Sequence, residues 1–185
     1  MNSNKRGKLV LYSGSSGVGK GTILAEVMKR NPKVRLSVSN TTRAPREGEI
    51  DGVHYHFVSR KEFEDLIARD GYLEYAEYCE NLYGTPKQQV EDMLDNGYDV
   101  FLEIEVQGGL QIMEKYPDVL SIFILPPSVD ELERRLRNRG TEDEETVQKR
   151  LTEAKNEIAL KDKYRYLVVN DDLETAIKEV LDIIR

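Results

Sequence analysis

The stretch SGSSGVGKGT, residues 13–22, decides the fold of this chain. Within it, Gly14 and Gly19 are five apart and Lys20 follows directly, which gives the pattern GxxxxGK. The apolar run KLVLYS (Lys8–Ser13) precedes the pattern, and a segment with helical periodicity follows it. A strand, this loop and a helix in that order are the context of a phosphate-binding loop. An ordinary glycine-rich turn is the alternative, but spacing, lysine and context together favour the phosphate-binding loop.

The chemistry of such a loop follows from its backbone. Glycines allow several N–H groups to point inward as an anion-binding nest, and the helix N-terminus adds partial positive charge. Lys20 brings a full positive charge to the β- and γ-phosphates. Gly21 stands where many such loops carry a hydroxyl for magnesium, but Mg²⁺ readily keeps water in place of a protein ligand. We expect a nucleoside triphosphate to bind the residues of this loop, which are Gly14, Ser15, Ser16, Gly17, Val18, Gly19, Lys20, Gly21 and Thr22.

The composition limits the class of protein. With 185 residues, 39% of them hydrophobic and 33% charged, the chain suits one globular domain. Its net charge of −7 argues against general nucleic-acid binding, which favours a basic face. The apolar runs are too short to span a bilayer, and the polar N-terminus lacks the apolar segment of a secretion signal. Cys79 is the single cysteine, so no intrachain disulfide can form, and we expect a cytoplasmic protein.

Apolar, β-branched runs alternate with helix-period segments along the chain, which is typical of a mostly parallel sheet flanked by helices. We therefore predict an α/β fold, a P-loop three-layer fold with a mostly parallel five-stranded core sheet. Ser59, Ser128 and Thr141 each precede a glutamate by three positions, which is capping-box spacing and marks three helix starts. The predicted strands are Lys8–Ser13, Val34–Ser39, Tyr98–Ile104, Val119–Leu125 and Tyr164–Val169.

Two segments interrupt the alternation. Thr42–Pro86 contains short strand-like pieces and one helix, which indicates a small α+β insertion. Pro126–Leu160 is a helical pair joined at NRGT, and its high charge indicates a lid that can move rather than a part of the core. We predict one domain over residues 1–185, with core segments 1–41, 87–125 and 161–185, an insertion at 42–86 and a lid at 126–160.

Two further features lie after predicted strands. Glu103 and Glu105 in FLEIEVQG are two residues apart, and so share a face if the strand continues that far. One or both are candidates for the metal shell or an acceptor phosphate, and solvated residues at a strand end are the alternative. Arg43 and Arg46 lie in a Thr/Pro loop with Tyr55 close by, and two guanidinium forks with a hydroxyl suit a phosphate dianion.

The chain resembles the guanylate kinase family over essentially its whole length from Lys8 onward. The motif TTRxPRxGExxGxxYxF is specific to that family and to its non-catalytic scaffold relatives, whereas the phosphate-binding loop alone is not. The segments that carry the resemblance are Gly14–Thr22, Ser39–Phe57, Gly71–Pro86, Phe101–Gly108, Leu125–Glu142 and Val168–Leu173.

The resemblance implies that residues 42–86 bind GMP. In the family, arginines matching Arg43 and Arg46 grip the GMP phosphate, and tyrosines matching Tyr55 and Tyr83 complete the cradle. The residues that read the base match Ser39, Glu74 and Thr85. A carboxylate accepts the N1–H and N2–H₂ donors of guanine as a pair, so a site built around Glu74 rejects adenine.

Other matched positions lie on the acceptor side and in the lid. Glu105 matches a family position that is aspartate in some members, where it contacts the guanine side and helps to organise magnesium. Asn170 matches a segment near the adenine of ATP. The resemblance implies that arginines spread the negative charge of the transferring phosphoryl group. With Lys20, the expected catalytic residues are Arg43, Arg135, Arg139 and Arg150.

Other candidates for chemistry are weaker. His54 and His56 are at strand spacing and resemble half a metal site, but no nearby cysteine or third histidine completes it. Cys79 has Glu77 and Glu80 close by, and their negative charge disfavours a reactive thiolate.

The resemblance implies the reaction ATP + GMP ⇌ ADP + GDP in purine nucleotide metabolism, with Mg²⁺ as cofactor and in-line transfer. dGMP is a further acceptor to test. The expected partners are the small molecules ATP and GMP, with no nucleic acid or membrane, and the oligomeric state stays open. One alternative is a non-catalytic guanylate-kinase-like module that binds phosphorylated peptides. Another is a kinase of a different nucleoside monophosphate, which Glu74 with Ser39 and Thr85 disfavours.

Overall fold

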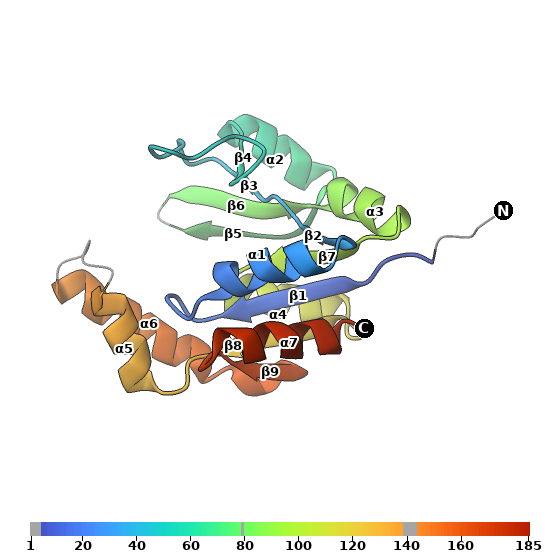
Figure 1. Cartoon of the computed structure of the whole chain (residues 1–185). Helices are drawn as coiled ribbons and strands as arrows, with labels where there is room; N and C mark the ends of the chain where they lie inside the picture. Colours follow the sequence, from blue (N-terminus) through green and yellow to red (C-terminus); the bar gives the residue numbers. More distant parts are fainter. Residues whose placement is uncertain (1–4, 79, 139–143) are drawn as a thin grey trace.

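A computed structural model describes residues 5–78, 80–138 and 144–185 of the chain. Its centre is a parallel sheet in which every strand pair runs in the same direction (Figure 1). The strand order is β2-β7-β1-β8-β9, so the strand before the phosphate-binding loop is central. The strands are β1 (Leu9–Gly14), β2 (Val34–Leu36), β7 (Asp99–Glu103), β8 (Leu120–Leu125) and β9 (Tyr166–Val169). The predicted α/β fold with a five-stranded core sheet is confirmed.

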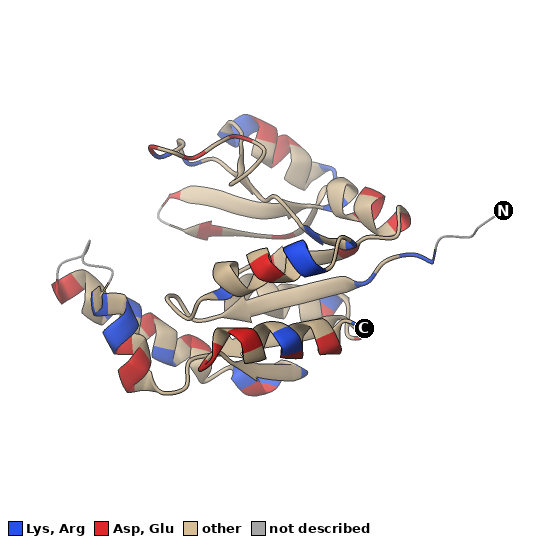
Figure 2. Ribbon diagram, in the orientation of Figure 1, with Lys and Arg blue, Asp and Glu red and all other residues tan. Residues whose placement is uncertain are grey.

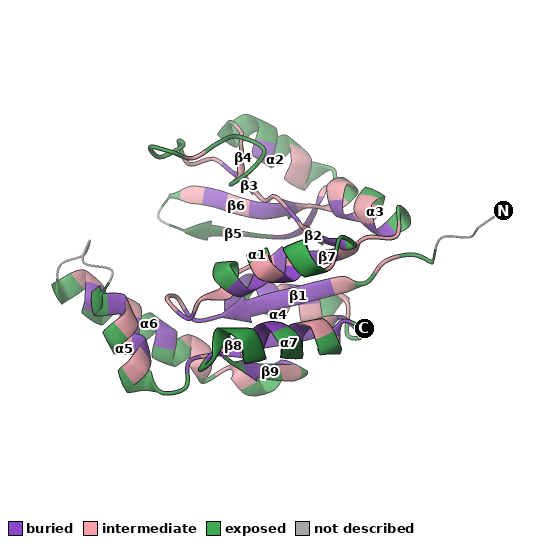
Figure 3. Ribbon diagram, viewed as in Figure 1, coloured by how far each residue is buried: buried purple, intermediate pink, exposed green. Residues whose placement is uncertain are grey.

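Helices cover both faces of this sheet and give the three layers. On one face, α1 (Lys20–Arg30) and α7 (Leu173–Ile183) pack on the side chains of Val10 and Tyr12. On the other face, α3 (Lys87–Asp95) and α4 (Val106–Lys115) pack on Leu11 and Phe123. Successive β1 side chains point to opposite faces, and both faces are apolar, as expected for a strand between two helical layers. In Figure 3 the sheet is mainly buried and the outer helix faces are exposed.

Residues 40–86 form a second, four-stranded sheet with the order β4-β3-β6-β5. Its strands are β3 (Asn40–Thr41), β4 (His56–Phe57), β5 (Tyr72–Tyr78) and β6 (Asn81–Pro86). Helix α2 (Arg60–Ala68) covers it, with the Phe63 ring stacked on Tyr72 at 4.3 Å between centroids. Ser59 and Glu62 form the predicted capping box at the start of α2. This sheet lies to one side of the core sheet (Figure 1).

The predicted helical pair is present as α5 (Val129–Asn138) and α6 (Glu144–Ile158). The Ser128 hydroxyl accepts the backbone N–H of Glu131, whereas Thr141 lies outside the described residues. The two helices enclose a small apolar cluster of their own, and charged residues of both signs cover their outer faces (Figure 2). The cluster consists of Leu132, Leu136, Val147, Leu151 and Ala154. In Figure 1 the pair lies at the end of the molecule where the loop after β1 is found.

Three strand ends differ from the prediction. Strand β2 ends at Leu36, because the chain then crosses to β3 in the second sheet. Strand β9 begins at Tyr166, after a short 3₁₀ helix (Lys161–Lys163). Strand β7 ends at Glu103, and Glu105 is the N-cap of α4, whose first turn closes with a hydrogen bond from Gly109 N–H to the Glu105 carbonyl. The prediction that Glu103 and Glu105 share a strand face is therefore wrong.

None of the described helices is both long and apolar enough to cross a membrane.

Candidate functional site

The loop after β1 has the backbone shape that its glycines predict. Gly19 has a φ of 96°, and an added Cβ would lie 2.6 Å from Nδ2 of Asn170. Gly14 approaches β8 so closely that a Cβ would lie 2.5 Å from the carbonyl oxygen of Ile124. Side chains at these two positions would force the loop to shift, since one contact is with backbone and the other is with a buried amide. The loop is thus fixed between β1, β8 and the end of β9.

Lys20 is the first residue of α1, and its ammonium group folds back over the loop. Nζ donates to the carbonyl oxygens of Gly14 at 2.6 Å and of Ser15 at 3.0 Å. The Lys20 carbonyl in turn accepts the buried Tyr12 hydroxyl at 3.1 Å. The positive charge therefore lies within the loop, beside the start of a helix, where an anion would be attracted.

Two acidic residues lie near this charge but have different surroundings. Glu103, at the end of β7, is 4.0 Å from the position of a Cβ on Gly21. Burial raises the pKa of Glu103, and the charge of Lys20 opposes that increase. Glu105 is exposed, and its charge raises the pKa of both Tyr55 and Glu74. Glu103 thus faces the phosphate-binding loop, whereas the charge of Glu105 acts on Tyr55 and Glu74 of the second sheet and on Glu157 of α6.

The predicted phosphate cradle surrounds Arg43. Its guanidinium lies 5.6 Å from the ring centroid of Tyr55 and also hydrogen-bonds Tyr83, and the two tyrosine rings are 6.0 Å apart. Both terminal nitrogens of Arg43 donate to the carboxylate of Glu49, at 2.9 and 2.8 Å. The backbone N–H of Arg46 also donates to Glu49 at 2.7 Å. These bonds lower the pKa of Glu49 to about 2.

The base-reading candidates lie further along the second sheet. The Thr85 hydroxyl donates to Oε1 of Glu74 at 2.6 Å, and both residues are buried. Burial raises the pKa of Glu74, while Thr85 and Lys115 favour the ionised form. Ser39 is half-buried, and its carbonyl accepts the His56 N–H at 2.9 Å. Glu74 and Thr85 are thus brought together on neighbouring strands β5 and β6, as the sequence suggested.

The helical pair α5 and α6 places two arginines near the phosphate-binding loop. Nη2 of Arg150, on α6, donates to the Ser16 hydroxyl at 2.5 Å. Arg135, on α5, bonds Glu131 at 2.8 Å and the Asn170 carbonyl at 3.1 Å. The Asn170 side chain continues this chain of contacts to the Val18 carbonyl at 2.8 Å. Arg139, the third predicted lid arginine, lies outside the described residues.

The guanylate kinase family model matches residues 6–185 of the chain. The chain belongs to the guanylate kinase family. A guanylate kinase of Carboxydothermus hydrogenoformans is 53% identical over 95% of this chain and 86% of its own length. One of Streptococcus thermophilus is 52% identical over 98% of this chain and 87% of its own length.

Solved structures agree with the family assignment. The crystal structure of guanylate kinase from Anaplasma phagocytophilum matches with a TM-score of 0.76 and 36% identity, over 100% of this chain and 87% of that one. A shikimate kinase from Bacteroides thetaiotaomicron matches over 95% of this chain and 97% of that one, with a TM-score of 0.50 and 13% identity, which shows a shared fold alone. Guanylate kinases are nucleoside monophosphate kinases, so the chain is an enzyme of that class and not the non-catalytic phosphopeptide module.

Two residues at the site of this guanylate kinase family member escaped the sequence analysis. Glu49 holds Arg43; it is the glutamate of the motif TTRxPRxGExxGxxYxF, but the sequence analysis gave it no role. Glu157, on α6, accepts the backbone N–H of Ser16, and Lys20 also lowers its pKa against the effect of burial. Its signal was a carboxylate beside the apolar stripe of α6, next to Ile158.

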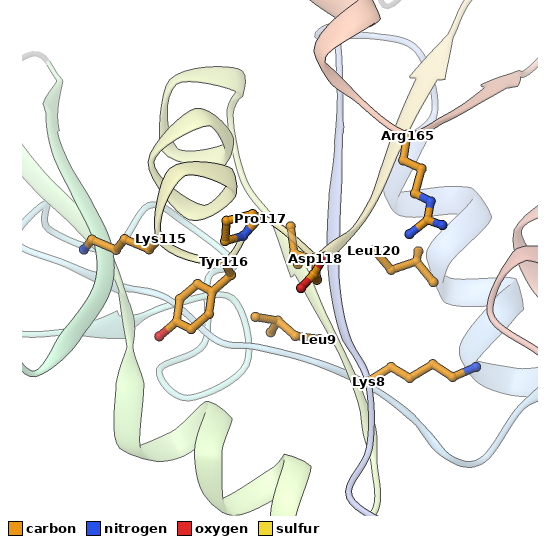
Figure 4. A pocket seen from close by; sticks show the side chains of 9 residues that line it. Lys8, Leu9, Lys115, Tyr116, Pro117, Asp118, Leu120 and Arg165 are labelled. Atoms are coloured by element: carbon orange, nitrogen blue, oxygen red, sulfur yellow. The ribbon is translucent and has the colours of Figure 1, made fainter.

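A separate hollow of 580 Å³ lies at the opposite edge of the core sheet, beside the amino ends of β1 and β8 (Figure 4). Leu9, Tyr116 and Leu120 line it with three cationic residues. Of these, Lys8 donates to the Ile184 carbonyl and Lys115 to the Leu73 carbonyl, and Figure 4 shows Lys115 pointing away from the hollow. Two of the three cations are thus held by backbone carbonyls, which leaves Arg165 as the cation directed towards the hollow (Figure 4).

The two histidines of the second sheet have structural contacts. Nδ1 of His54 accepts the Ile50 N–H at 3.0 Å, and Nε2 of His56 lies 3.0 Å from the Gln89 amide on α3. Within the described ranges, no group of three or more His, Cys, Asp or Glu residues is arranged to hold a metal. Cys79 lies outside those ranges.

Proposed function

We propose that this chain transfers the γ-phosphoryl group of ATP to GMP, giving ADP and GDP. The observation that carries the proposal is the Glu74–Thr85 pair, because a buried carboxylate beside a hydroxyl suits guanine rather than adenine. Arg43 with Tyr55 and Tyr83 lies in the same sheet and suits the GMP phosphate. dGMP offers the same base and phosphate, so we expect it to be a second acceptor.

ATP would bind through its phosphates to the loop of residues 14–22. Lys20 would meet the β- and γ-phosphates, since its ammonium group already lies over the loop carbonyls. Asn170 would lie near the adenine, because its side chain touches the loop at Val18 and its backbone touches Arg135. The same contacts couple the donor site to the lid.

GMP would be held at both ends by the second sheet. Glu74 would accept the N1–H and N2–H₂ donors of guanine, and the Ser39 hydroxyl would suit its O6. The Thr85 hydroxyl, which donates to Oε1 of Glu74, would hold that carboxylate in place for the base. Adenine lacks the N2 donors and would leave the Glu74 carboxylate buried without its partners, which costs about 1–3 kcal/mol or more for a charged group. Arg43, with Arg46, would fix the phosphate with its N–H groups that do not face Glu49.

Transfer would depend on positioning and on charge stabilisation. In a loose transition state the negative charge spreads over the equatorial oxygens, and arginines of the lid would neutralise it. Arg150 is supported for this role by its contact with Ser16, and Arg135 by its contact with Asn170. Arg139 is proposed on the family resemblance alone.

The donor set also fits Mg²⁺, which prefers oxygen ligands and keeps several waters. Glu103 would reach the ion through water, because it lies beside Gly21 and Lys20 at the phosphate-binding loop. Glu105 would act from the acceptor side. When bound, the ion would neutralise negative charge on the phosphate oxygens of ATP. Residues 42–86 would move as the GMP-binding part and residues 126–160 as the lid, and their closure would exclude water from the site. We place the protein in the cytoplasm.

A coupled assay for ADP formation with GMP, dGMP, AMP, UMP and CMP tests this function. We expect kcat/KM for GMP to exceed that for AMP by about 10³-fold or more, as for sites that read polar groups. The variant Lys20→Ala, prepared in parallel, controls for contaminating kinases. Equal rates with GMP and AMP, or no ADP formation with GMP, would refute the proposal.

A further inference from the structure

Helix α4 of the core touches the strand that carries Glu74. Strand β5 lies at the edge of the second sheet, so one side of its backbone has no neighbouring strand among the residues that the structure describes. On that side, Nζ of Lys115 donates to the Leu73 carbonyl at 2.8 Å, and Nε2 of Gln111 donates to the Tyr75 carbonyl at 3.2 Å. These are the residues directly before and after Glu74. Side chains of α4 thus donate to the β5 carbonyls on both sides of Glu74, as a neighbouring strand would do.

A third residue of α4 meets the carboxylate itself. A Cβ on Gly108 would lie 2.7 Å from Oε2 of Glu74, so a larger residue at this position would force the carboxylate to shift. Positions 108, 111 and 115 are spaced i, i+3 and i+7, which places them on one face of a helix. We call Gly108, Gln111 and Lys115 the α4 clamp.

The strand is irregular where the clamp holds it. The pairing of β5 with β6 shifts register between Tyr72 and Tyr75, which is a bulge around Leu73 and Glu74. A bulge breaks the regular ladder and re-aims a side chain, so the ladder alone does not fix the direction of Glu74. The two carbonyl contacts from α4 fix the backbone on both sides of the bulge.

Lys115 also acts on Glu74 through its charge. Three groups besides burial influence the carboxylate: Thr85 on β6 and Lys115 on α4 favour the ionised form, and Glu105 at the N-cap of α4 opposes it. Guanine requires the ionised form, because a protonated carboxyl has one donor where an acceptor is needed. Lys115 therefore fixes the backbone next to Glu74 and also favours the ionised Glu74 carboxylate, which is the form that guanine needs.

We propose that Lys115, as part of the α4 clamp, is a positioning residue that sets the affinity and selectivity for the guanine base. This proposal rests on the assignment of Glu74 as the base reader. It assigns to the core helix a part in acceptor recognition that is separate from the phosphate-binding residues. It also explains why α4 has glycine at position 108, where helix propensity alone disfavours it.

The test compares Lys115→Met, which keeps the length of the stem, with Lys115→Arg and with Lys61→Met. Lys61 is the matched control, since it is an exposed lysine on α2 that pairs with Asp65. For Lys115→Met we expect KM for GMP to rise about tenfold, while KM for ATP and kcat at saturating GMP change less than about twofold. Loss of one charge-assisted hydrogen bond is of this size. Lys115→Arg should restore most of the affinity, and Lys61→Met should behave as the unmodified enzyme.

The pH profile separates positioning from a general structural role. Removing the Lys115 charge raises the pKa of Glu74, so the acid limb of kcat/KM for GMP should move to higher pH. The limb of kcat/KM for ATP should not move. An unchanged KM for GMP with an unmoved acid limb, or equal losses for ATP and GMP, would overturn the proposal.

A second variant guards against a simple folding defect. Gly108→Ala favours the helix, yet its methyl group would displace Oε2 of Glu74. We expect a raised KM for GMP without a lower melting temperature, and normal GMP affinity would count against the clamp. Glu74→Gln separates the assignment of Glu74 as base reader from the proposal about the α4 clamp. If Glu74→Gln leaves GMP use unaffected, the assignment of Glu74 is wrong. If Glu74→Gln impairs GMP use but the clamp variants do not change KM for GMP, only the clamp proposal is wrong.

Discussion

Replacement of Glu74 by glutamine should reduce GMP use strongly without harming the fold. The Glu74 carboxylate is 5% exposed, accepts the Thr85 hydroxyl through Oε1 and lies against Gly108 through Oε2. Glutamine has nearly the same shape but presents one acceptor and one amide donor group. One guanine N–H would lose its acceptor and face an N–H group instead.

The size of this effect follows from the two losses. A hydrogen bond to a charged group contributes about 1.5–3 kcal/mol, and a buried donor left without a partner costs about 1–3 kcal/mol. Together they amount to about 2.5–6 kcal/mol, which is a decrease of about 10²-fold to 10⁴-fold in kcat/KM for GMP. KM for ATP should not change, because the donor site is the loop after β1 of the core sheet, whereas Glu74 lies on β5 of the second sheet.

The Glu74→Gln substitution should not lower the stability of the protein, although it reduces GMP use. Burial raises the pKa of Glu74, so the native protein holds a carboxylate at a cost that a neutral amide avoids. We expect an equal or higher melting temperature for Glu74→Gln. The matched control is Glu77→Gln on the same strand, an exposed residue that pairs with Arg60 and should leave GMP kinetics unchanged. A loss of less than about threefold in kcat/KM for GMP, with the fold intact, would refute the reasoning.

Three further changes test other parts of the site. Lys20→Ala should lower turnover by orders of magnitude with little change in melting temperature, and near-normal turnover would contradict its phosphate role. Gly19→Ala should destabilise the protein by about 1–3 kcal/mol and weaken ATP binding, because its φ is 96° and a Cβ would meet the Asn170 amide; chemical denaturation and ATP titration measure both. The pKa of Glu49 is lowered to about 2, so its pair with Arg43 contributes stability above about pH 4.5 that is lost as the pH falls towards 2. Glu49→Gln should therefore show a shallower loss of melting temperature between these pH values, and an identical acid profile would show that the pair contributes nothing.

Local patterns predicted a large part of this molecule. The spacing of Gly14, Gly19 and Lys20 requires a strand before it and a helix after it, and both are present. The Ser59 capping box was readable because its two partners are three residues apart. Such features depend on residues that are close in the sequence, so they can be predicted without knowing the tertiary contacts.

Contacts between distant segments were not predictable in the same way. Glu103 and Glu105 were expected to share a face only if the predicted strand Tyr98–Ile104 continued as far as Glu105, yet β7 ends at Glu103 and Glu105 is the N-cap of α4. The contact of Lys115 with Leu73 joins residues 42 positions apart, and nothing local to either one signals it. The roles of the site residues and the boundaries of the insertion and the lid stay predictions, which the experiments above address.

The apolar cluster between α5 and α6 has a calorimetric consequence. Leu132, Leu136, Val147, Leu151 and Ala154 are each nearly inaccessible to solvent within the helical pair. If the pair shifts as a unit, the contacts among these side chains are kept, and the apolar area that changes is mostly the small patch where Leu132 and Leu136 approach Gly17 of the loop after β1. Heat-capacity changes follow apolar area, so lid movement itself should be almost silent in this quantity. The heat capacity of nucleotide binding would then report mainly on the surfaces that the nucleotides cover.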